Sequence, residues 1–357
     1  MKKFLLLMAA FSFAFMLAAC GRAETFEIAM ITDAGDIDDE SFNQGTWEGI
    51  VAFAEANNKT YAYYRPAEIS DAAYLNAIDL AISAGARIVI TPGFLFMAAI
   101  GEAQAQHPDV KFVLIDAVPT GGTGSNTVSI LFAEHESGFL AGYAAVRDGY
   151  RDLGFMGGIA VPAVVRFGIG FIAGVYYAAN ELDVLGEIVF PNNRFAYLGN
   201  FDASDAHRTR ALSWFEGGTE LIFVAAGGAG SSVMSAAEAR DGAKVIGVDV
   251  DQGPLSETVI TSAMKDLASA VDQMLTAFFA DEFPGGQVLT LDASNAGVAL
   301  PDDFSRFNSF TQAQYQSIFN RIASGEIDVP SSHAELVSFL DDLNILDVLE
   351  ITADTTS

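Results

Sequence analysis

The chain has 357 residues and a formal net charge of −28, with 51% hydrophobic and 18% charged residues. This length accommodates two domains, and with so high a hydrophobic content the acidity does not imply intrinsic disorder. A surface this acidic lacks the basic footprint needed for nucleic acid and has no electrostatic attraction to anionic lipid, so we expect neither as a binding partner.

The N-terminus indicates a lipoprotein. A short basic start and an apolar run that ends at Ala19 predict a signal peptide over residues 1–19. Leu17-Ala18-Ala19-Cys20 fits the bacterial lipobox, in which the cysteine becomes diacylated, and Cys20 is the only cysteine in the chain. The alternative is an ordinary secretory signal with a chance cysteine. We expect residues 20–25 to tether the protein to the cell membrane, facing the extracytoplasmic side (periplasm or cell surface).

The first half of the remaining chain alternates short apolar runs with helical stretches, which predicts βαβ units and a parallel sheet. We expect strands at 26–32, 61–65, 86–93 and 110–116, and helices at 41–57, from Asp71 and up to Gln106. These elements define a first α/β lobe over residues 26–148.

The alternation restarts after Gly149. We expect strands at 153–159, 195–200, 219–228 and 243–251, and helices at 164–182, 205–218 and 231–242. They define a second lobe over residues 149–280, and no glycine- or serine-rich linker separates the two. Residues from about 281–330 are expected to return to the first lobe, which leaves 331–357 as a C-terminal tail. Two such Rossmann-like, doubly wound lobes form a ligand cleft at the carboxyl ends of their strands.

Motifs for enzymatic or metal chemistry are missing from the sequence. There is no glycine-rich dinucleotide fingerprint, no P-loop and no nucleophile elbow. The four histidines are far apart and lack zinc-ligand spacing. Read as an EF-hand from Asp36, the acidic loop has Ser41 where glycine is required and Trp47 where glutamate is required. We therefore expect a protein that is not an enzyme and has neither a cofactor nor a metal site.

The acidic stretch TDAGDIDDESFN at residues 32–43 has two parts. Asp36 to Glu40 precede a helix, where negative charge is favoured, and we interpret them as a solvated, capping rim. Asp33 directly follows a buried strand, the position at which open α/β sheets present side chains to a ligand. Phe42 and Asn43, in the first helical turn, are expected to face the same crevice.

Several segments together resemble the basic membrane lipoprotein family, the nucleoside-binding lipoproteins that serve ABC importers. They are IAMITDAGDIDDESFNQGTWEGI, GARIVITPGFLF, VKFVLID, GFLAGYAA, GGIAVPAVVRFGIGFIAGV, and VIGVDVDQ followed by VITSAMKDL. The resemblance covers about residues 26–280 and implies a type I periplasmic-binding-protein fold of two lobes joined by three crossings. It also implies a monomer with a purine nucleoside as ligand and an ABC permease as partner.

The resemblance implies that the first lobe reads the base. Phe42 is similar to one of the two rings that stack on it, and either Phe201 or Phe167 supplies the other. Asp116 resembles the carboxylate that reads the base edge, with Asp33 beside it. A carboxylate accepts hydrogen bonds from ring N–H and amine donors, which favours purine edges.

The second lobe is implied to bind the ribose. Asp249 resembles the carboxylate that takes a pair of sugar hydroxyls, and Asp251 is the alternative because the spacing permits both. Lys265 resembles the family's ribose-contacting lysine. The backbone could approach the ligand closely at two further residues, Gly227 and Gly228.

The function that these features predict is capture and delivery of a nucleoside. The choice of base stays open, because Ala34 stands where the family often has an amide. Two rivals are a type I binding protein for a sugar or another small heterocycle, and a lipoprotein enzyme that hydrolyses nucleosides. A sensor partner or adhesin is a further alternative.

Overall fold

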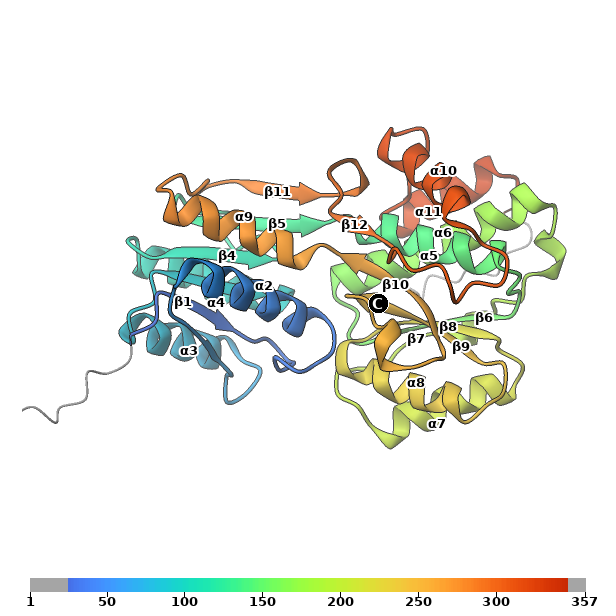
Figure 1. Cartoon of the computed structure of the whole chain (residues 1–357), viewed down its shortest axis with the longest axis horizontal. Helices are drawn as coiled ribbons and strands as arrows, with labels where there is room; N and C mark the ends of the chain where they lie inside the picture. Colours follow the sequence, from blue (N-terminus) through green and yellow to red (C-terminus); the bar gives the residue numbers. More distant parts are fainter. Residues whose placement is uncertain (1–24, 346–357) are drawn as a thin grey trace, which may run out of the picture.

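The computed structural model describes residues 25–345, and within them the chain forms two α/β lobes that lie side by side (Figure 1). The expected signal peptide, Cys20 and residues 346–357 lie outside the described residues. Each lobe is built on a six-stranded sheet with helices on both faces, and this confirms the predicted doubly wound α/β architecture.

The first lobe has a fully parallel sheet in the order β11-β5-β4-β3-β1-β2. Its strands are β1 (Ile28–Ile31), β2 (Tyr61–Tyr64), β3 (Ile88–Pro92), β4 (Lys111–Ile115), β5 (Thr127–Phe132) and β11 (Val288–Leu291). Its helices are α2 (Phe42–Asn57), α3 (Asp71–Ser83), α4 (Met97–Gln106) and α9 (Leu267–Phe279).

Alternation along β1 shows why these strands read as continuous apolar runs. Ile28 and Met30 pack into the core layer that includes α2 and α9, whereas Ala29 and Ile31 pack into the layer beneath α3 and α4. Strands buried on both faces are apolar at nearly every position, as is usual in parallel sheets.

The second lobe repeats this plan in the order β12-β10-β9-β8-β6-β7, with only β12 antiparallel. Its strands are β6 (Leu153–Gly157), β7 (Phe195–Tyr197), β8 (Leu221–Ala225), β9 (Lys244–Asp249), β10 (Val259–Lys265) and β12 (Val298–Ala299). Its helices are α5 (Glu134–Arg147), α6 (Pro162–Leu182), α7 (Asp205–Glu216), α8 (Gly230–Glu238), α10 (Gln312–Ala323) and α11 (His333–Asp342).

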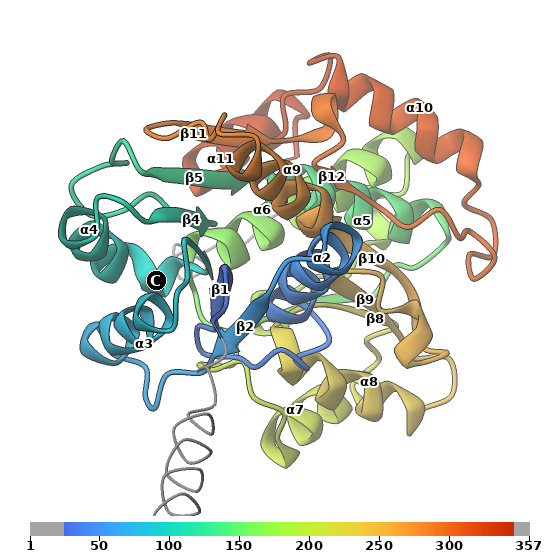
Figure 2. The same ribbon diagram turned by 60° about the vertical axis from the view of Figure 1, so that its left-hand side comes forward.

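The chain crosses between the lobes three times, and the lobe boundaries differ from the expected ones. The crossings fall between β5 and α5, between β10 and α9, and between β11 and β12 (Figure 2). Consequently α5 belongs to the second lobe and α9 to the first, although the sequence placed them the other way round. Of the segment 281–330, only β11 returns to the first sheet. The α10 helix packs on α5, and α11 packs on α6, so the tail up to Ile345 forms part of the second lobe.

Glycines decide the position of α5, because they let it lie directly against α6. A Cβ at Gly138 or Gly142 would collide with backbone carbonyls of α6, and one at Gly170 or Gly174 would collide with carbonyls of α5. Among the described helices, α6 alone is long and apolar enough to cross a membrane, yet most of its most apolar stretch is buried inside the protein. It is therefore a core helix of the second lobe.

Candidate functional site

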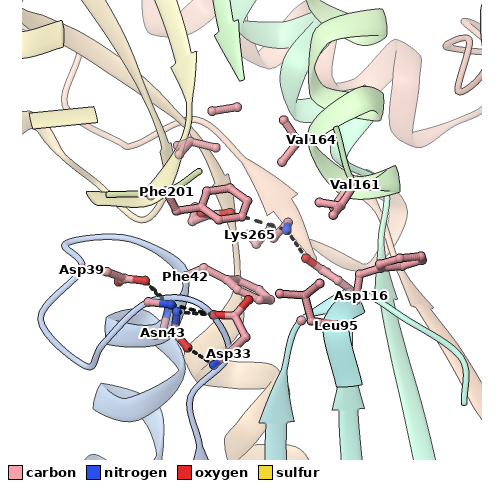
Figure 3. A pocket seen from close by; sticks show the side chains of 18 of the residues that line it. Asp33, Asp39, Phe42, Asn43, Leu95, Asp116, Val161, Val164, Phe201 and Lys265 are labelled. Carbon is pink, nitrogen blue, oxygen red and sulfur yellow. Dashed lines mark hydrogen bonds and ion pairs between the residues drawn. The ribbon is translucent and has the colours of Figure 1, made fainter. Parts of the chain in front are cut away.

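A cavity of about 700 Å³, measured with its open mouth, lies between the lobes at the carboxyl ends of both sheets (Figure 3). Most of the residues that the sequence singled out line it: Asp33, Phe42, Asn43, Asp116, Phe167, Phe201, Gly227, Gly228, Asp249 and Lys265. Asp251 does not. It is exposed, and its Oδ1 accepts a hydrogen bond from the Gly253 N–H at 2.9 Å.

One wall of the cavity is a carboxylate–amide–carboxylate bridge. Nδ2 of Asn43 donates to Asp33 Oδ1 at 2.9 Å and to Asp39 Oδ2 at 2.8 Å. Because Asn43 is only 3% exposed and both of its amide protons are committed, it holds the two carboxylates in place. Burial raises the pKa of Asp33, although the hydrogen bond from Asn43 opposes that effect.

Asp39 departs from the solvated rim in which the sequence placed it. Its carboxylate accepts from the backbone N–H groups of Ser41, Asn43 and Gln44, each at 3.0 Å, and so caps α2 as expected. The same side chain lines the cavity, and burial raises its pKa to about 6. Asp36 instead pairs with Arg65 at 2.6 Å, and Asp38 is exposed.

Asp116 and Asp249 occupy equivalent places in the two lobes, at the ends of β4 and β9. Both have left-handed backbone conformations, with φ values of 64° and 66°. Such conformations are uncommon for residues other than glycine, although aspartate adopts them more readily than most, and they cluster at functional sites. Each residue is 6% exposed, and Asp116 Oδ1 has no hydrogen-bond partner among the described residues.

Lys265 ends β10 and brings a buried positive charge to these carboxylates. Its Nζ lies 2.6 Å from Asp116 Oδ2 and 3.5 Å from Asp249 Oδ1. Nζ also lies 4.6 Å from the centre of the Phe42 ring and 5.2 Å from that of Phe167. Burial disfavours the ammonium, but the surrounding carboxylates outweigh that effect and raise the pKa of Lys265, which stays charged.

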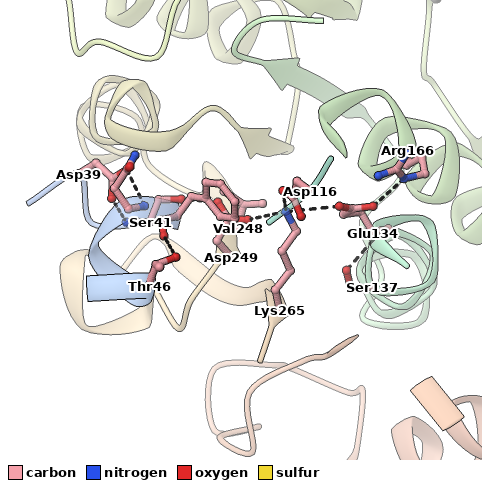
Figure 4. Close-up of polar contacts among 12 residues, drawn as sticks. Asp39, Ser41, Thr46, Asp116, Glu134, Ser137, Arg166, Val248, Asp249 and Lys265 are labelled. Atoms are coloured by element: carbon pink, nitrogen blue, oxygen red, sulfur yellow. Dashed lines mark hydrogen bonds and ion pairs between the residues drawn. The ribbon is translucent and has the colours of Figure 1, made fainter. Parts of the chain in front are cut away.

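Sequence reasoning missed two charged residues behind this pair (Figure 4). Glu134 opens α5 with no exposed surface, and its Oε1 lies 3.4 Å from Lys265 Nζ. Its Oε2 accepts a hydrogen bond from Arg166 Nε at 2.6 Å. In the sequence, a glutamate in the first turn of a helix looks like an ordinary charge at a helix start, so no local signal set Glu134 apart.

Two aromatic side chains approach the cavity from opposite lobes. Figure 3 shows Phe42 on the side of the first lobe and Phe201 on the side of the second. The Phe201 ring packs so closely over Gly158 that a Cβ there would overlap the ring carbons. Gly227, at φ 53°, carries the chain past the same ring. Phe167 is only 2% exposed and also packs edge-on against Phe223 in the core.

Direct hydrogen bonds also join the lobes at the cavity. Ser41 Oγ donates to Asp249 Oδ2 at 2.6 Å, and Gln252 Nε2 donates to the Glu40 carbonyl at 2.8 Å. Gln252 is 1% exposed, and its Oε1 accepts from the Val248 N–H, so its orientation is fixed by its own lobe. The conformation described is therefore one in which the lobes are in contact.

The arrangement of the two lobes around the cavity identifies the class of protein. Two doubly wound lobes joined by three crossings, with a polar and aromatic cavity between them, have the architecture of type I solute-binding proteins. A solute-binding protein of an ABC transporter system from Aeropyrum pernix K1 superposes with a TM-score of 0.74 at 23% identity, covering 90% of this chain and 98% of that one. One from Conexibacter woesei gives 0.67 at 22% identity, covering 85% and 98%.

The family follows from the sequence comparisons. Residues 26–333 match the Bmp family, described as ABC transporter substrate-binding protein PnrA-like, and the chain belongs to that family. It is 29% identical to the ABC transporter nucleoside-binding protein BmpA of Lactococcus lactis subsp. cremoris, over 87% of this chain and 91% of that protein. It is 27% identical to basic membrane protein A of Borreliella burgdorferi, over 89% and 91%. The chain is thus an ABC transporter substrate-binding protein.

Proposed function

We propose that the chain captures a purine nucleoside between its lobes and delivers it to a membrane permease. The observation that carries this proposal is the placement of Phe42 and Phe201 on opposite sides of a cavity whose polar lining consists mainly of carboxylates. Two opposed rings suit a flat heterocycle, since stacking contributes roughly 0.5–1.5 kcal/mol beyond burial. Carboxylates suit a ligand rich in N–H and O–H donors.

The base is assigned to the first lobe. Within the described part of the chain, Asp116 Oδ1 is buried without a hydrogen-bond partner, and a buried acceptor in that state favours a ligand that donates to it. Asp33, fixed by Asn43, supplies a second acceptor on the same wall. Asn43 itself is assigned a positioning role, because its amide protons are already used.

The sugar is assigned to the second lobe, at Asp249 and Lys265. Asp249 is preferred to Asp251 because only Asp249 lines the cavity. The surplus of carboxylates over the single lysine disfavours a phosphate group, so nucleosides are expected to bind better than nucleotides. Since each lobe supplies part of the polar set, a ligand that contacts both lobes favours the closed form.

The anchor and the assembly are part of the same proposal. Cys20 carries the lipid that holds the monomer at the extracytoplasmic side of the cell membrane, where the closed form meets the permease. Radiolabelled palmitate should be incorporated into the wild type and not into Cys20→Ser, and a labelled Cys20→Ser variant would contradict the anchor.

The residue assignments can be tested by calorimetry with inosine, guanosine and adenosine. Asp116→Ala should weaken binding and abolish selectivity among the three bases. The control Asp251→Ala removes an aspartate side chain that does not line the cavity, and it should change neither the affinity nor the selectivity. Unchanged affinity in Asp116→Ala would overturn the assignment of Asp116 to the base.

A further inference from the structure

The Lys265 ammonium stands where three carboxylates converge, and one of them belongs to a residue outside the cavity. Asp116 and Asp249 line the cavity, whereas Glu134 lies behind them with no exposed surface. An ammonium has three N–H donors, one for each of the three carboxylates around it. The position of Lys265 therefore depends on a residue that the ligand cannot reach.

The two oxygens of Glu134 are in different environments. Oε2 is held by Arg166 Nε at 2.6 Å. Oε1 forms no hydrogen bond within the described residues and faces Lys265 Nζ at 3.4 Å. A buried carboxylate oxygen without a hydrogen bond is costly and uncommon in native proteins. Arg166 thus fixes one end of Glu134 and leaves the other directed at Lys265.

The structure assigns Glu134 as a positioning residue of the binding site: together with Arg166 it sets the position and the charge of the Lys265–Asp116 pair that faces the ligand. The inference rests on the proposed function in one respect, namely that Asp116 accepts hydrogen bonds from the ligand. Neither Glu134 nor Arg166 contacts the ligand in this account.

Electrostatics predict the direction in which the pKa of Asp116 should move when Glu134 or Arg166 is replaced. Burial raises the pKa of Asp116 to about 7, the Lys265 ammonium beside it opposes that, and the negative charges of Glu134 and Asp249 add to it. The Arg166 guanidinium interacts with Asp116 in the opposite sense to Glu134. Removing the charge of Glu134 should lower the pKa of Asp116, and removing that of Arg166 should raise it.

The first experiment needs no ligand. The full-length protein, labelled at the aspartate carboxyl carbon, is titrated by NMR, and the Asp116 signal is assigned from its loss in Asp116→Asn. The titration midpoint should fall in Glu134→Gln, rise in Arg166→Gln and stay near that of the wild type in Glu134→Asp, which keeps the charge. Glu187→Gln removes an exposed carboxylate of the same lobe and should change nothing.

The second experiment measures inosine affinity against pH in the same variants. Binding should strengthen as Asp116 ionises through about pH 7. Glu134→Gln should move that profile to lower pH and weaken binding about tenfold at its plateau, the scale of one lost charged interaction. An unmoved Asp116 midpoint in both Glu134→Gln and Arg166→Gln would overturn the inference, as would Glu134→Asp behaving like Glu134→Gln. A wild type that binds no nucleoside would instead refute the proposed function and leave the NMR result standing.

Discussion

Replacing Lys265 with methionine removes the positive charge that Asp116 and Asp249 share and leaves the buried Glu134 with Arg166 alone. Truncating one partner of a buried ion pair typically costs about 3–5 kcal/mol of unfolding free energy. At roughly 2–4 °C per kcal/mol, the melting temperature should fall by roughly 6–20 °C.

The loss should depend on pH with a definite sign. In the folded wild type, burial already raises the pKa of Asp116 to about 7, and Lys265 opposes that rise. Without Lys265 the folded-state pKa rises further above its unfolded value. In Lys265→Met the folded state then tolerates Asp116 only in its protonated form. The loss of stability relative to the wild type should therefore be large above about pH 8, where Asp116 must ionise, and small below about pH 5.

The assay is thermal unfolding at both pH values, with Lys244→Met as the matched control. Among the residues that the structure describes, Nζ of Lys244 reaches only the Glu257 carbonyl, at 3.4 Å, so its loss should be nearly neutral at either pH. A stability deficit in Lys265→Met that is the same at both pH values would refute the electrostatic reasoning.

Three further predictions concern the scaffold and the contact between lobes. Gly174→Ala should lower the unfolding free energy by about 1–3 kcal/mol in urea titrations, because its Cβ would collide with the Phe139 carbonyl. The control Gly186→Ala places its Cβ in open space and should leave the unfolding free energy unchanged, and equal effects of the two variants would contradict the packing argument. Burial raises the pKa of Glu136 to about 7, so Glu136→Gln should remove a charge that is unfavourable in the folded state. Above about pH 8 the variant should be more stable than the wild type by on the order of 1 kcal/mol, after discounting for solvent screening, and near about pH 5 by less. An unfolding free energy that does not increase at high pH would argue against this. Gln252→Ala should open the cleft and increase the radius of gyration in small-angle scattering, since it removes a hydrogen bond between the lobes, and an unchanged radius would mean that this bond does not hold them together.

The elements and the architecture could be predicted because their signals are local. Buried parallel strands require uninterrupted apolar runs, and β1, β3, β4, β8 and β9 all show them. The membership of α5 and α9 could not be predicted, because it depends on contacts between residues distant in the sequence. Nothing in the sequence near Gly138 states that it will meet the backbone of α6.

The residues of the candidate site also fall into two groups, those that local sequence signals reveal and those that only the structure reveals. Asp33, Asp116 and Asp249 each stand at or just after the end of a buried strand, a position that the sequence reveals. The spacing of Asp249 and Asp251 permits either to face the ligand. The structure separates them, because Asp249 lines the cavity and Asp251 is exposed. Glu134 contacts Arg166 on another helix and Lys265 at the end of a strand, and no local pattern encodes those contacts.

The central claim, that the inter-lobe cavity holds a purine nucleoside, is tested most directly by thermal-shift titration of the wild type with nucleosides, free bases, nucleotides and sugars. A ligand at a hundredfold excess over its dissociation constant should add about 2.7 kcal/mol of stability. We predict that inosine, guanosine or adenosine gives that gain, whereas ribose and the nucleoside monophosphates give little. Stabilisation by a sugar with no response to any purine nucleoside would contradict the account.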